Sequence, residues 1–113
     1  MANTFKNAIK SNVNNGYYHS LYTAPSSSGN TAIILGLALA NKTTSAVTVK
    51  VQINDTDASN ATIQLLEDVS IPANTTLEVL GGQKYVLEAG DILKVQAGTG
   101  TAIDAFLGVM ERT

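Results

Sequence analysis

The stretch from Thr31 to Asn54 constrains the fold most, because its pattern predicts two long strands joined by the polar turn Asn41–Ala46. In the second strand, apolar residues from Val47 to Ile53 alternate with polar ones, which predicts one buried face and one solvated face. The first strand, 31–41, is apolar on both faces. It carries large side chains on one face and small ones on the other. This pattern predicts a central strand whose second face is also covered.

Shorter segments on either side of this pair also alternate in the manner of strands. They are expected at 17–24, at 61–67 with Val69 and Ile71 extending the alternation, and at 75–80, 84–88, 92–97 and 102–111. Turn residues separate them, and helical periodicity is almost absent. The sequence therefore predicts an all-β fold, either a β-sandwich (Ig-like or jelly-roll-like) or a small barrel, and we expect the sandwich.

The first 16 residues differ in composition from the rest of the chain. Five asparagines accompany a few apolar residues at helical spacing, so a short amphipathic helix and an extended arm both fit. Asn15-Gly16 is a strong turn signal that ends the segment. We therefore divide the chain into an N-terminal arm, 1–16, and a sandwich domain, 17–113. The residues expected to make assembly contacts with neighbouring subunits are Phe5, Ile9, Val13, Tyr17 and Tyr18.

Composition excludes several classes of function. A chain of 113 residues with 44% hydrophobic and 14% charged residues is expected to fold as one domain with an aliphatic core. A net charge of −2 gives no basic field, so we expect neither nucleic acid nor a membrane as partner. No apolar run suits a signal peptide or a membrane span, so synthesis in the cytoplasm is expected. Cysteine is absent, so stability must come from packing.

No catalytic constellation can be assembled from the residues. His19 is the sole histidine, and neither a cysteine nor a nucleophile-elbow motif accompanies it. We therefore expect no enzymatic activity and no cofactor. Tyr17, Tyr18, Tyr22 and Tyr85 could form a sugar-stacking platform, but tyrosine is common on strands without any ligand.

Two acidic turns are candidate sites, Asn54–Asp57 for calcium and Glu88–Asp91 as a pair of carboxylates. The loop Asn54–Asp57 offers oxygen ligands of the kind calcium takes, but it lacks the glycine and the distal glutamate of an EF-hand loop. A solvated turn is the favoured interpretation. Glu88–Asp91 is interpreted as a hairpin turn in which Gly90 adopts a positive φ. Asp104 interrupts an apolar strand and either faces solvent or meets a cation of a partner; the alternation favours the solvent side. We therefore expect no bound metal.

Four segments together resemble small structural proteins of tailed bacteriophages, particularly the cyanophage type. They are Leu21-Tyr-Thr-Ala-Pro25, the strand Thr31–Asn41, the turn Ile71-Pro-Ala-Asn74 and the hairpin run Lys84–Leu93. In that family a YT-x-P strand, an xLANxT strand end, an xIPAG turn and a VLEAGD hairpin recur in this order. Here Asn74 stands where glycine is usual, and Ala24 where valine is usual.

The resemblance implies a virion structural protein that works by protein–protein assembly. Within that class we expect a capsid decoration protein, with the major capsid protein or other virion proteins as partners. A homo-oligomer is expected, and the apolar first strand is compatible with a trimer. The alternatives are a tail, neck or fibre component, or a glycan- or receptor-binding module of a tail fibre.

Overall fold

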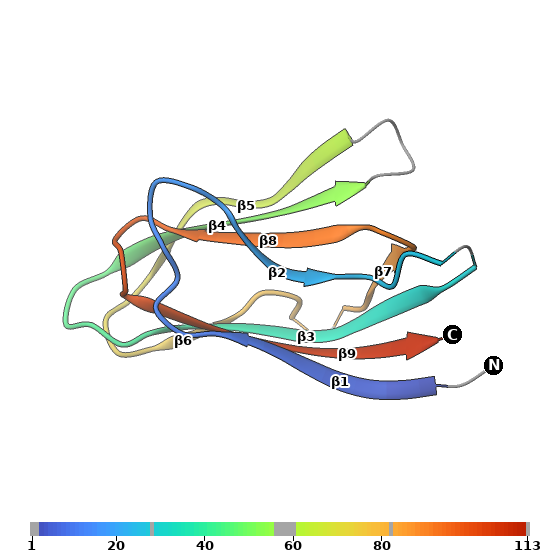
Figure 1. Ribbon diagram of the computed structural model, residues 1–113. Helices are drawn as coiled ribbons and strands as arrows, with labels where there is room; N and C mark the ends of the chain where they lie inside the picture. Colours follow the sequence, from blue (N-terminus) through green and yellow to red (C-terminus); the bar gives the residue numbers. More distant parts are fainter. Residues whose placement is uncertain (1–2, 28, 56–60, 82, 113) are drawn as a thin grey trace.

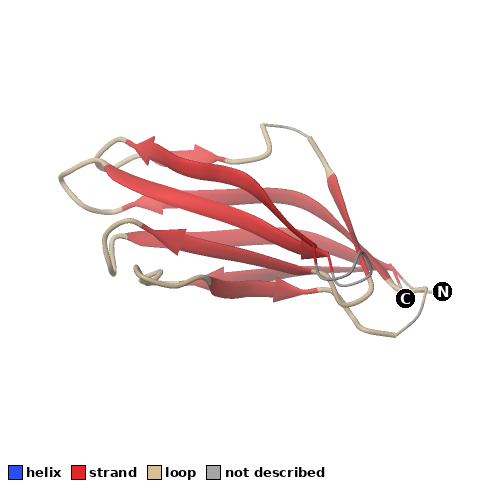
Figure 2. Ribbon diagram, turned by 90° about the horizontal axis from the view of Figure 1, so that it is seen from above, coloured by secondary structure: helices blue, strands red, loops and turns tan. Residues whose placement is uncertain are grey.

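The computed structural model describes residues 3–27, 29–55, 61–81 and 83–112, which form strands and connecting turns without any helix. Two antiparallel sheets pack face to face (Figures 1 and 2). Sheet A has the order β1-β9-β3-β6, with β7 also paired to β3, and sheet B has the order β2-β8-β4-β5. The strands are β1 (Asn3–Lys10), β2 (His19–Thr23), β3 (Thr31–Asn41), β4 (Val47–Asp55), β5 (Ala61–Ile71), β6 (Thr76–Glu78), β7 (Tyr85–Glu88), β8 (Ile92–Ala97) and β9 (Ile103–Arg112). The predicted β-sandwich is confirmed.

The core is the aliphatic layer between the two sheets. Leu37 and Leu107 from sheet A are almost fully buried, as are Val51 and Val95 from sheet B. Alternation along each strand places these side chains inward and their neighbours outward. Among the described residues, no helix is long and apolar enough to cross a membrane.

The two long strands are present as predicted, but they do not pair with each other. β3 lies in sheet A and β4 in sheet B, so the polar turn between them crosses from one sheet to the other. The buried Asn41 holds this crossover. Its side-chain nitrogen donates to the carbonyl oxygens of Ser45 and Ile71 at 2.8 and 3.0 Å, and its side-chain oxygen accepts the Thr43 N–H at 2.9 Å. These hydrogen bonds pair polar backbone groups of the turn, which has no hairpin ladder to pair them.

The prediction of an arm separate from the sandwich is wrong for Asn3–Lys10. These residues form β1, which pairs with β9 along its whole length, from Asn3 opposite Arg112 to Lys10 opposite Ala105. The physical reason is that β9 would otherwise be an unpaired apolar edge, which β1 covers with main-chain hydrogen bonds. Of the two conformations considered, the extended one is correct. β1 lies at the edge of sheet A beside β9 (Figure 1).

Gly90 has the predicted left-handed conformation, with a φ of 83°. The predicted hairpin is wrong, because the Glu88–Asp91 turn connects β7 in sheet A to β8 in sheet B and the two strands do not pair. The turn is closed by the Asp91 N–H donating to the Glu88 carbonyl oxygen at 3.0 Å. We expect Gly90→Val to lower the free energy of unfolding by about 1–3 kcal/mol, because a β-branched residue fits a positive φ badly. Urea denaturation of both proteins measures the difference. A Gly90→Val variant as stable as the parent would contradict this account of the turn.

Candidate assembly surface

The outer face of sheet A is apolar across three adjacent strands. Ile9 on β1 lies opposite Phe106 on β9, which lies opposite Ala38 on β3. Two outward positions further along β9, past Gly108, Phe5 lies opposite Met110, and Met110 lies opposite Ile33 on β3. The exposed fractions are 72% for Phe5, 71% for Ile9 and 51% for Phe106. We call this surface the outer face of sheet A.

A bulge in β3 adds an exposed apolar side chain, Leu35, to the outer face of sheet A. The register between β3 and β9 shifts between Ile34 and Gly36, so Leu35 has no single partner on β9. Because the side-chain period is two, the bulge moves Leu37 to the inner face, where Ile34 also lies, and leaves Leu35 partly exposed. Val86 on β7, opposite Ile33, is a further exposed apolar residue. The described residues therefore do not supply the expected cover for the second face of this strand.

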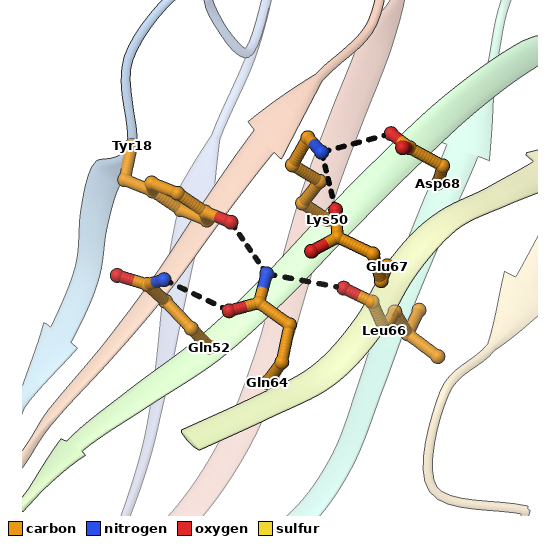
Figure 3. A network of polar contacts seen from close by, with 7 residues as sticks. All are labelled: Tyr18, Lys50, Gln52, Gln64, Leu66, Glu67 and Asp68. Carbon is orange, nitrogen blue, oxygen red and sulfur yellow. Dashed lines mark hydrogen bonds and ion pairs between the residues drawn. The ribbon is translucent and has the colours of Figure 1, made fainter. Parts of the chain in front are cut away.

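The outer face of sheet B carries polar side chains that form hydrogen bonds and ion pairs with one another (Figure 3). Gln52 donates from Nε2 to Oε1 of Gln64 at 3.0 Å, and Gln64 donates to the Tyr18 hydroxyl oxygen at 2.5 Å. Lys50 donates to Glu67 and forms an ion pair with Asp68, which raises the pKa of its ammonium group. A face with satisfied polar groups gains little from further burial. The outer face of sheet A is therefore apolar, whereas the outer face of sheet B is polar.

The predicted contact residues do not all lie on the surface. Phe5 and Ile9 are exposed on the outer face of sheet A, and Tyr17 is exposed in the loop before β2. Val13 is 1% exposed, and its N–H donates to the Ile103 carbonyl oxygen at 2.8 Å. The prediction that Val13 contacts a neighbouring subunit is therefore wrong, because its side chain belongs to the chain's own core. Tyr18 is half-buried and bonded to Gln64.

Sequence reasoning missed most of the outer face. Phe106, Met110, Leu35 and Val86 were assigned to strands without being recognised as outward and apolar. One signal was available: in the run from Ile103 to Val109, Phe106 occupies a position that alternation assigns to solvent. A single exposed apolar residue is common, so Phe106 becomes informative only once strand pairing places it among other apolar residues.

A polar clip fixes β1, and with it Phe5 and Ile9, to the rest of the sandwich. Glu111 on β9 is 7% exposed and accepts a hydrogen bond of 2.5 Å from the Tyr22 hydroxyl on β2. Lys6 on β1 forms an ion pair of 3.0 Å with the other carboxylate oxygen. The Tyr22 hydrogen bond, together with Lys6, lowers the pKa of Glu111 despite its burial. The clip therefore joins both sheets.

The clip predicts a pH dependence of stability. A carboxyl group with a lowered pKa in the folded state contributes stability that is present above its unfolded pKa of about 4.3 and is lost as the pH falls through the folded value. We expect Tyr22→Phe to cost about 1–3 kcal/mol at pH 7, because Glu111 loses a donor while staying buried. The cost should shrink below roughly pH 4.

Urea denaturation between pH 3 and pH 8 measures this effect, with Tyr17→Phe as the control that removes a hydroxyl from an exposed ring. If Tyr22→Phe were equally destabilising at every pH, its effect would come from packing and not from the carboxylate.

Three carboxylates from two separate turns come together in the structure. Asp55 ends β4, while Glu88 and Asp91 flank the Gly90 turn, and one oxygen of each lies within 4.8 Å of the others. Thr56 and Asp57 of the loop weighed for calcium lie outside the described residues. The Asp91 carboxylate accepts the Glu88 N–H at 2.9 Å, which is the bond expected of a turn. Acidic groups often gather in this way, and we assign no ligand here.

The remaining candidates have structural environments. Asp104 lies outward as predicted, accepts the Asn12 N–H at 2.9 Å and pairs with Lys42 at 3.0 Å. These contacts, the Asn12 bond first, lower its pKa. His19 is half-buried on β2 opposite Val95. The four tyrosines do not form a shared platform, since Tyr22 belongs to the clip and Tyr85 lies on β7 in the other sheet.

No family model matches this sequence, and no curated protein sequence matches it. Solved structures do share the fold. A chain of the disulfide-linked pili of Bacillus endospore appendages has a TM-score of 0.55 at 12% identity, with 98% of this chain and 88% of that chain covered. A chain of the capsid of Helicobacter pylori bacteriophage KHP30 has a TM-score of 0.58 at 14% identity, with 98% and 87% covered.

A chain of the T13 particle of IBDV has a TM-score of 0.54 at 12% identity. The match covers 96% of this chain but only 30% of that chain. At these identities the likeness concerns the fold alone, because one architecture serves many functions.

Proposed function

We propose that this chain is a structural protein of a tailed-phage virion that acts by protein–protein assembly, and specifically that it decorates the capsid. The observation that carries the proposal is the apolar outer face of sheet A. Its five most exposed apolar residues are Phe5, Ile9, Leu35, Val86 and Phe106, which come from four strands of one sheet. The largest apolar patch of a protein is often functional, so we expect another molecule to cover this one.

The motifs and the fold comparisons support the same class of role. The YT-x-P, xLANxT and VLEAGD segments are similar to those of small phage structural proteins, and they map to β2, to β3 and to β7 with the turn that follows it. Two of the solved structures with this fold come from pili and from a phage capsid, which are both large assemblies. This chain has no cysteine, so its own assembly must rely on packed surfaces.

Quantitative mass spectrometry of purified virions tests the proposal. A decoration protein is expected in copy numbers proportional to those of the major capsid protein. A few copies per particle would instead assign the chain to the tail, neck or fibre. Absence from particles would overturn the virion role.

The role as a glycan- or receptor-binding module is tested separately by binding to a glycan array. The tyrosines are dispersed between the two sheets, so we expect no affinity that Tyr17→Ala abolishes.

A further inference from the structure

Two glycines face each other in the middle of the outer face of sheet A. Gly36 on β3 lies directly opposite Gly108 on β9. Neither has a positive φ, and a Cβ atom built on either would meet nothing within 4 Å. Glycine weakens the interior of a strand, and it often marks a place where another molecule approaches closely. Gly36 also borders the bulge at Leu35, which favours glycine there. No described residue crowds Gly108, so the glycine at this position points to a partner.

The glycines form the floor of a hollow beside a projecting aromatic ring. The hollow has a volume of about 290 Å³ and is lined by Leu35, Gly36, Glu78, Phe106 and Gly108, among others. A second hollow of about 390 Å³, lined in part by Ile9 and Ala40, lies on the other side of Phe106. Both hollows include Ala38 and Phe106 in their walls. Phe106 therefore separates two depressions on the same face.

We infer that the outer face of sheet A binds the same face of a second copy of this chain about a two-fold axis. In this dimer, Phe106 of each copy occupies the glycine-floored hollow of the other. A two-fold contact requires one patch to be complementary to itself, and a patch with both a projection and a hollow meets this requirement. The inference rests on the proposed function, because it assumes that this face is an assembly surface.

The size and charge of the face fit a second copy. The three long strands β1, β9 and β3, of 8, 10 and 11 residues, and the short strands β6 and β7 beside β3, of 3 and 4 residues, make up this face. At about 4.8 Å between strands and about 3.3 Å per residue they cover roughly 600 Å² in projection, comparable with the ~800 Å² of accessible surface that each partner buries in a standard interface. The outward residues of β1, β3 and β9 between Ile9 and Phe5 are uncharged, and Glu88 and Arg112 lie at the far ends of their strands. Glu78 on β6 and Asp104 on β9 each line one of the two hollows. The central parts of β1, β3 and β9 in two identical copies can therefore meet without like charges between them.

Gly108→Val is the decisive variant, because it fills the hollow without a clash in the single chain. Valine is also a better strand residue than glycine, so the variant is expected to fold at least as stably as the parent. By analytical ultracentrifugation at roughly 1–100 µM, we expect the parent to have twice the 11.8 kDa mass of one chain. We expect Gly108→Val to associate at least about 30-fold more weakly.

Ser20→Val is the matched control, since it adds the same branched side chain on the outer side of sheet B and should leave the dimer unchanged. If Gly108→Val fails to fold, Phe106→Ser tests the same contact from the projecting side, and it should also give a single chain. A parent protein that stays a single chain at 100 µM, a mass of three or more chains, or a dimer indifferent to both variants would overturn the inference.

A second measurement reports on geometry instead of affinity. The chain has no cysteine, so Asn7→Cys places a single thiol on β1 beside Gly108. A short bis-maleimide should cross-link this variant into dimers, whereas Ser20→Cys should stay uncross-linked. Equal cross-linking of both variants would overturn the assignment of the face. These tests use purified protein only, so their failure is distinguishable from absence of the chain in virions.

Discussion

Leu37→Asp is expected to abolish folding. Leu37 is 1% exposed in the centre of the sandwich, opposite Leu107 on β9. An ionised carboxylate at this position has no partner and costs several kcal/mol or forces the group to be protonated, against a total stability of roughly 5–15 kcal/mol. Circular dichroism should show loss of the sheet signal, and chemical denaturation should show no cooperative transition.

Ala38→Asp is the matched control, since it introduces the same carboxylate one residue further along β3 on the outer face. It should fold, when measured at low protein concentration so that association does not add to stability. Equal damage from the two variants would mean that the register of β3 is wrong.

The strands were predictable from the sequence because alternation is a local signal. The strand expected at 31–41 is β3, and the segment 61–67 with its extension to Ile71 is β5. Gly90 was predictable for the same reason, since a turn is specified by its own few residues. Asn74 stands where the phage family that this sequence resembles usually has glycine. Its φ is 57°, a conformation that asparagine tolerates better than most residues.

The pairing of the strands was not predictable, because it depends on residues far apart in the chain. The separation of β3 and β4 into different sheets rests on Asn41 reaching the carbonyl oxygen of Ile71, 30 residues away. The bulge at Leu35 reversed the faces within β3, and uninterrupted alternation cannot reveal such a change. The outer face was missed as a consequence: its residues come from β1, β3, β7 and β9 and meet only through tertiary pairing.

β1 is the second place where a large effect is expected, because it is a strand of the sandwich and not a separate arm. Deleting residues 2–14 removes the strand that pairs with β9 over its length and removes Val13 from the core. Loss of Val13 alone costs about 1.5–3 kcal/mol. The exposed β9 edge, with the apolar sequence from Ala105 to Met110, becomes a template for pairing with other chains.

We therefore expect the deletion product to aggregate or unfold, as size-exclusion chromatography and circular dichroism would reveal. Replacing Phe5 and Ile9 together by serine is the contrasting variant, because it keeps β1 and its main-chain bonds and alters only two outward side chains. That variant should fold normally but lose self-association, since each large side chain contributes roughly 1.5–3 kcal/mol when buried against a partner. A soluble, normally folded deletion product would instead restore the segment to the role of a separable arm. The pair of variants thus separates what β1 contributes to the sandwich through its backbone from what it offers to a partner through Phe5 and Ile9.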